Sequence, residues 1–205
     1  MIEAPEANQP SPWPTLNPVD QAYAEMGLEL LLCSVQSPVN IGMIMRTAEA
    51  FCFALSIFDP HHVLADKEKA KTIEDFACGS LPRRSFVHLA DRAAIRRRRA
   101  GRRLIVTSIM PDARDLRGIQ FQRGDIIALG NEYDGMPDEL LAEADLLLHI
   151  PLPETWIPKP VSWYPIDPSR NSVSNDGTAN LNVAMSAGII CYSAYIGWTQ
   201  QHRTR

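Results

Sequence analysis

The chain has 205 residues, of which 45% are hydrophobic, and its formal net charge is −4. This length and hydrophobic fraction predict one domain with one sizeable core. No apolar run reaches membrane-spanning length, no basic-then-apolar segment opens the chain, and the acidic balance does not by itself suggest a nucleic-acid partner. The four cysteines are scattered without a C-x-x-C pair, which is typical of buried side chains in a reducing compartment, so we expect a cytoplasmic protein.

Residues 1–26 contain five prolines and little apolar periodicity, which predicts a flexible arm that is either disordered or wrapped on the surface. The first predicted strand covers residues 28–35. A helix is expected over 41–51, with Asn40 well placed as its N-cap. Arg46 falls in the middle of this helix among mostly apolar neighbours, a position that is also typical of a solvated or snorkelling arginine.

Arginines are concentrated in one part of this acidic chain. A strand at 55–58, a charged amphipathic helix at 66–76 and a short strand at 84–89 precede a predicted helix at 91–100. Seven arginines fall within twelve residues here, namely Arg92, Arg96, Arg97, Arg98, Arg99, Arg102 and Arg103. Four consecutive arginines cover most sides of a helix, which favours a phosphate-contacting surface over a salt-bridged or solvated face. The predicted RNA-binding residues are Arg96, Arg97, Arg98 and Arg99.

The middle of the chain alternates strands with helices. Short apolar runs at 104–109 and 126–129 are typical of buried strands. A polar loop at 130–135 follows, then a helix that begins near Pro137 and a strand at 146–150. This alternation predicts an α/β fold with a mainly parallel sheet flanked by helices, in which ligands bind at the carboxyl ends of the strands.

Two further segments complete the expected domain, which covers residues 27–200. Residues 153–178 hold five prolines, two tryptophans and a tyrosine, which indicate a lid, a binding loop or disorder. Its aromatic side chains could stack on bases or pack on the surface. Residues 181–198 form a nearly all-apolar helix, which predicts burial, including burial in a subunit interface. Residues 201–205 form an exposed tail.

Three segments carry motifs, in order along the chain. Residues 38–48, PVNIGMIMRTA, have the pattern N-x-G-x-x-x-R-T-A. Residues 130–153, GNEYDGMPDELLAEADLLLHIPLP, have the pattern G-x-E-x-x-G, then a helix and an apolar strand that ends in I-P. Residues 180–184, NLNVA, are similar to S-L-N-V-S. These segments resemble the three signature motifs of the SpoU/TrmH family of RNA ribose 2′-O-methyltransferases, and the chain is identified as a member of that family.

The resemblance implies a C-terminal deep trefoil knot, S-adenosylmethionine as methyl donor, an RNA substrate and a homodimer with its active site at the subunit interface. Minimal members of the family act on tRNA, which favours tRNA over rRNA. The catalytic residues that the motifs imply are Arg46, Glu132, Asn182 and Asn40. The cofactor-binding residues that they imply are Thr107, Gly130, Ile150, Leu152, Asn180 and Leu181. We expect no metal, because the five histidines have no zinc-like partners.

Two departures from the family pattern leave two hypotheses open. Asn180 stands where the family has serine, and although an amide still donates and accepts hydrogen bonds, it does not copy the position of a hydroxyl. The connection at 153–178 is longer than is usual in the family. The first hypothesis is an active 2′-O-methyltransferase, which the four motif residues favour. The second is a catalytically silent RNA-binding relative.

Overall fold

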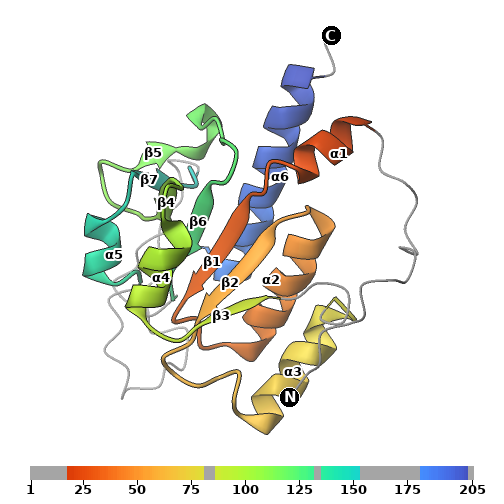
Figure 1. Cartoon of the computed structure of the whole chain (residues 1–205), viewed down its shortest axis with the longest axis vertical. Helices are drawn as coiled ribbons and strands as arrows, with labels where there is room; N and C mark the ends of the chain where they lie inside the picture. The colour runs from red at the N-terminus through yellow and green to blue at the C-terminus, as the bar shows by residue number, and fades with distance from the viewer. Residues whose placement is uncertain (1–17, 81–85, 132–134, 153–180, 203–205) are drawn as a thin grey trace.

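The central sheet of this protein is parallel. The computed structural model describes residues 18–80, 86–131, 135–152 and 181–202 (Figure 1). Within these residues seven strands pair in the order β3-β2-β1-β6-β4-β7-β5, each pair parallel. In chain order they are β1 (Glu29–Cys33), β2 (Ala54–Phe58), β3 (Val87–Leu89), β4 (Leu104–Thr107), β5 (Arg114–Asp115), β6 (Ile126–Leu129) and β7 (Leu146–His149). The predicted α/β fold with a parallel sheet is therefore confirmed.

Helices cover both faces of this sheet. In the described ranges they are α1 (Pro18–Ala24), α2 (Pro38–Ala50), α3 (Lys67–Ala77), α4 (Arg92–Arg99), α5 (Asp138–Ala142), α6 (Val183–His202) and the 3-10 helix η1 (Leu116–Gly118). None of these described helices has the length and hydropathy that a membrane crossing requires.

Helix α1 lies in the segment for which the sequence predicted a flexible arm. Tyr23 packs edge-to-face on Tyr195 of α6, with ring centroids 5.3 Å apart. The Tyr195 hydroxyl donates a hydrogen bond to Asp20 Oδ1 at 2.9 Å. The last part of the arm is therefore a docked helix, because the aromatic side chains of α6 give it a surface to pack on. Residues 1–17 lie outside the described part of the chain.

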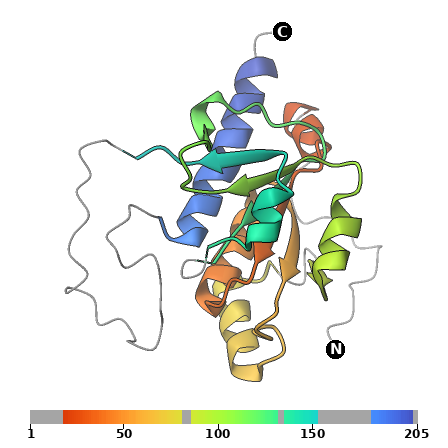
Figure 2. The same ribbon diagram turned by 90° about the vertical axis from the view of Figure 1, so that its left-hand side faces the viewer.

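Side chains alternate between the two faces of the buried strands, as a period of two requires. Leu30 and Leu32 of β1 belong to the core cluster shared with α1, α2, α3 and α6. Leu31 and Cys33 belong to the cluster that includes Ile95 of α4 and residues of α5. The fold therefore has three layers, and Figures 1 and 2 show α4 and α5 on the opposite side of the sheet from α6.

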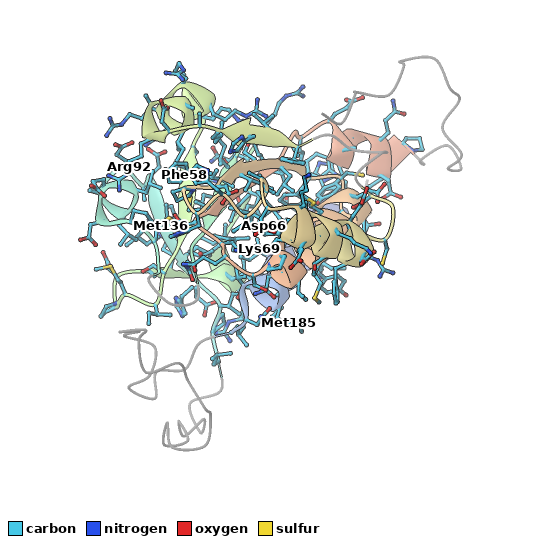
Figure 3. All side chains as sticks on the ribbon, turned by 90° about the horizontal axis from the view of Figure 1, so that it is seen from below. Phe58, Asp66, Lys69, Arg92, Met136 and Met185 are labelled. Carbon is cyan, nitrogen blue, oxygen red and sulfur yellow. The ribbon has the colours of Figure 1, made fainter. Side chains whose placement is uncertain are left out.

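Because the strands are parallel, all of them end at one edge of the sheet, which we call the carboxyl edge; the opposite edge is the amino edge. Figure 3 looks onto the carboxyl edge and labels Phe58 at the end of β2, Met136 before α5 and Met185 near the start of α6. Helices α2 to α6 begin on this side. The three motif segments are thereby brought to the same edge of the fold.

Candidate active site

The first and third motifs meet through two asparagines. Asn182 Nδ2 donates a hydrogen bond to Asn40 Oδ1 at 3.1 Å, across 142 positions of sequence. Asn182 Oδ1 accepts hydrogen bonds from the backbone N–H groups of Ala184 at 2.9 Å and Met185 at 3.3 Å. Asn182 therefore caps α6 and holds Asn40 with the same amide.

Asn40 is not the N-cap of α2, which corrects the prediction. The helix begins three residues earlier than expected, at Pro38, and its N-cap is Ser37. Ser37 Oγ accepts a hydrogen bond from the Asn40 backbone N–H at 3.3 Å. The start moves because proline is well suited to the first helical position. Asn40 lies inside the first turn, 8% exposed, where its side chain is available to Asn182.

Arg46 lies two turns into α2 and is exposed. Its Nη1 donates a hydrogen bond to Cys78 Sγ at 3.4 Å, just after α3. Gly42, one turn earlier on α2, does not leave open space beside the guanidinium. A Cβ atom on Gly42 would lie 2.6 Å from the Ile73 carbonyl oxygen and 2.8 Å from Phe76 Cβ. Gly42 is instead where the backbone of α3 packs closely on α2.

The loop of the second motif leaves β6 and folds back on itself. Asn131 and Gly135 exchange two backbone hydrogen bonds of 3.1 and 2.9 Å. A Cβ atom on Gly130 would lie 2.7 Å from the Gly135 carbonyl, so glycine is required for this closure. Glu132 lies outside the described residues, and its catalytic role stays a prediction.

The other predicted cofactor residues follow neighbouring strands. Thr107 ends β4 and donates its hydroxyl hydrogen to the Ala128 carbonyl of β6 at 3.0 Å. Ile150 and Leu152, after β7, are half-buried, and so is Leu181. Since β4 lies between β6 and β7, the three loops share one stretch of the carboxyl edge. Asn180 and the long segment at 153–178 lie outside the described residues.

The arginines of the basic segment form salt bridges. The sequence had favoured a phosphate-contacting surface over a salt-bridged one, and this part of the prediction is corrected. On one side of α4, Arg92 pairs with Glu139 and Arg96 pairs with Glu143. Arg97 is the most exposed, with 73% of its side chain accessible and an ion-pair distance of 3.9 Å to Asp91. The sequence did not reveal most of these partners because, apart from Asp91 and the Asp125 partner of Arg103, they lie more than forty residues away along the chain. Contact of these arginines with RNA stays a prediction.

A buried carboxylate at the amino edge is the residue that sequence reasoning missed. Glu29 of β1 is fully buried and accepts a hydrogen bond from Arg98 Nε at 2.9 Å, besides bonds from Ser56 and Arg102. Burial alone raises the pKa of Glu29, but the hydrogen bonds from Arg98, Ser56 and Arg102 outweigh it and lower this pKa below the usual value. The sequence feature that could have revealed this residue is a single glutamate in the otherwise apolar segment ELLLC.

Parallel strands, with loops and polar side chains that meet at the carboxyl edge, define an α/β protein of the kind that binds ligands at this edge. Within that class, the chain belongs to the SpoU rRNA Methylase family, whose model matches residues 27–156. The predicted SpoU/TrmH family is therefore confirmed. The search of curated proteins finds no match.

Solved structures agree on the fold. One, described as giving insights into the 2-OH methylation of C/U34 on tRNA, is 26% identical with a TM-score of 0.65, and the alignment covers 84% of this chain and 97% of that one. AviRb from Streptomyces viridochromogenes, in complex with AdoMet, is 23% identical with a TM-score of 0.64, over 84% of this chain and 58% of that one. The A. aeolicus TrmH/SpoU tRNA modifying enzyme is 20% identical with a TM-score of 0.62, over 89% of this chain and 83% of that one.

Proposed function

We propose that this protein transfers a methyl group from S-adenosylmethionine to a ribose 2′-hydroxyl of tRNA or rRNA, with tRNA preferred. The observation that carries the proposal is the Asn40–Asn182 hydrogen bond, which joins the first and third motifs at the same edge of the sheet as the loop of the second motif. The similar structure from the study of 2-OH methylation on tRNA, 97% of which aligns with this chain, supports the choice of tRNA.

The residues at the carboxyl edge fit S-adenosylmethionine, which supplies an electrophilic methyl group when bound. Half-buried Ile150, Leu152 and Leu181 offer apolar surface for an adenine ring. Ile109 and Met110, directly after β4, add exposed apolar surface at 67% and 46%. Backbone groups of the loops after Thr107 and Gly130 would hold the polar parts, and we place Asn180 with them by family pattern.

Arg46 is the residue that we propose for catalysis. A guanidinium stays protonated at ordinary pH, so its better role is to grip the substrate phosphate and polarise the 2′-hydroxyl. In this proposal Glu132 orients Arg46 through a charge-assisted pair, and Asn182 with Asn40 fixes the start of α6 beside the site. Arg97, the most exposed arginine of α4, is the best placed of Arg96–Arg99 to contact an RNA phosphate.

The proposal includes a cytoplasmic homodimer with a knotted C-terminal region. On α6, exposed apolar side chains occur at positions i, i+4 and i+7: Met185 is 56% exposed, Ile189 38% and Tyr192 57%. This spacing places them on one helix face. In a single chain this apolar face is exposed to water, which is unfavourable. A two-fold pair would bury that face.

Two measurements test the function. Calorimetric titration with S-adenosylmethionine separates an active enzyme from a silent RNA-binding relative, the class that Asn180 favours. Binding is expected, and the absence of binding would support the silent relative. Mass spectrometry of RNA from a strain that lacks the gene should then show the loss of one 2′-O-methylated nucleotide. An unchanged set of modified nucleotides in tRNA and rRNA would contradict the proposed activity.

A further inference from the structure

We propose that Arg92, Arg96 and Arg99 are positioning residues for the cofactor loops. Together with their partners on α5 and at the start of β7 they form what we call the α4–α5 clamp. The clamp fixes the segment between the Gly130 loop and Ile150, and so acts on cofactor binding without touching the cofactor. This inference rests on the proposed function.

The three arginines lie on one face of α4, because their spacing of four and then three residues follows the helical repeat. Arg92 Nη1 lies 2.5 Å from Glu139 Oε1. Arg96 donates through Nε and Nη2 to Glu143 Oε1, at 2.8 and 2.6 Å. Glu139 and Glu143 are themselves four residues apart, so two charged rows face each other along the two helices.

The third arginine extends the clamp into the sheet. Arg99 Nη1 donates to the Glu143 carbonyl oxygen at 2.5 Å, and Nη2 donates to Asp145 Oδ2 at 2.9 Å. Asp145 Oδ2 also accepts a hydrogen bond from the Leu104 backbone N–H at 2.7 Å. The start of β7 is thereby tied to the start of β4, and the far end of β7 leads to Ile150.

Helix α5 needs such support because it has five residues and its N-cap, Pro137, makes no side-chain cap hydrogen bond. A helix this short is marginal without tertiary contacts. Leu140 is its buried residue, and Met136 just before it is 8% exposed. Figure 3 shows Arg92 and Met136 on the same side of the molecule, and Glu139, the partner of Arg92, follows Met136 by three residues.

The clamp and a phosphate-binding role make opposite predictions at Glu143. If the arginines bind phosphate, removing this carboxylate releases Arg96 and makes the surface more basic, so RNA binding tightens. If they form the clamp, the same change loosens α5 and weakens cofactor binding. Each pair is partly exposed, so the expected effect of losing one is modest.

The test measures S-adenosylmethionine affinity by calorimetry and amide hydrogen exchange of Asn131 and Gly135, whose backbone N–H groups are hydrogen-bonded across the loop. Glu143→Gln should weaken cofactor binding roughly two- to fivefold and speed exchange in this loop. Arg96→Gln should do the same. Arg123→Gln is the control, since it removes the same charge from an exposed arginine outside the clamp, just before β6 at the amino edge; it should leave both measurements unchanged.

Charge reversal gives the decisive comparison. Arg96→Glu and Glu143→Arg should each be impaired, and the double variant should recover most of the affinity and the slow exchange. Wild-type exchange and cofactor affinity in Glu143→Gln, with tighter RNA binding, would overturn the clamp in favour of phosphate contact. If the wild-type protein bound no S-adenosylmethionine, the proposed function would fail, while the exchange comparison would still decide for or against the clamp.

Discussion

At the scale of single residues, one amide performs two tasks. Asn182 caps α6 with its oxygen and holds Asn40 with its nitrogen. The two tasks are separable by substitution. Aspartate keeps an oxygen for the cap but has no N–H to donate, whereas alanine removes both.

We predict that Asn182→Ala lowers the free energy of unfolding by about 1 kcal/mol, because the N-cap is lost. Asn182→Asp should stay within a few tenths of a kcal/mol of the wild-type stability but lose methyl transfer, because the hydrogen bond to Asn40 is gone. Urea denaturation and a methyl-transfer assay check the two outcomes. Normal turnover in the aspartate variant would show that the bond to Asn40 has no part in catalysis.

Arg46 gives the second prediction. Arg46→Ala should reduce methyl transfer at least about 100-fold, with folding and S-adenosylmethionine affinity retained, since the cofactor loops belong to other motifs. Arg46→Lys should also fail, because lysine lacks the planar fork that grips a phosphate. An active alanine variant would remove Arg46 from the mechanism, and an active lysine variant would rule out a bidentate grip.

At the scale of secondary structure elements, the contact of α2 with α3 depends on Gly42. We predict that Gly42→Ala destabilises the fold by about 1–3 kcal/mol, because the added Cβ would overlap the backbone of Ile73 and α3 has to shift. Gly197→Ala on α6, away from the proposed interface, is the control: among the described residues outside the helix's own backbone nothing lies within 4 Å of an added Cβ, so the substitution should be neutral or stabilising. Thermal denaturation of both variants compares them. Equal melting temperatures would mean that α3 adapts freely.

At the scale of the whole molecule, Glu29 joins the sheet to the end of α4 and makes stability depend on pH. The pKa of Glu29 is lowered in the folded protein. Its contribution to the free energy of unfolding is therefore fully present above the usual glutamate pKa and is lost as pH falls through the lowered pKa. Acid should therefore destabilise the wild-type protein by protonating Glu29. Glu29→Gln should lose about 3 kcal/mol at neutral pH and show a flatter pH dependence below the usual glutamate range. Denaturant titrations across this pH range test the prediction. If the free energy of unfolding of Glu29→Gln and of the wild-type protein changed with pH in the same way, Glu29 would not be the group responsible.

Association is the second property of the whole molecule. We predict a homodimer at micromolar concentration, and light scattering should give twice the single-chain mass. Met185→Glu should shift the protein toward the single chain, because it places a charge in the exposed apolar face of α6. A single-chain mass for the wild-type protein would contradict the dimer and remove α6 as its interface.

The sequence by itself determined the parallel α/β sheet, the apolar C-terminal helix and the family, because these depend on local patterns: short apolar runs, their alternation with helices, and motifs within a few residues. The signal for the N-cap at Ser37 was also local, because the proline that follows it is typical of the first helical position. Tertiary structure alone decided which side chains meet. Asn40 and Asn182, and α4 and its acidic partners on α5, are far apart in sequence, and a local pattern carries no information about a partner that the folded chain brings from elsewhere. For that reason the arginine segment, which by composition favoured phosphate contact, proved to be bound to the protein's own carboxylates.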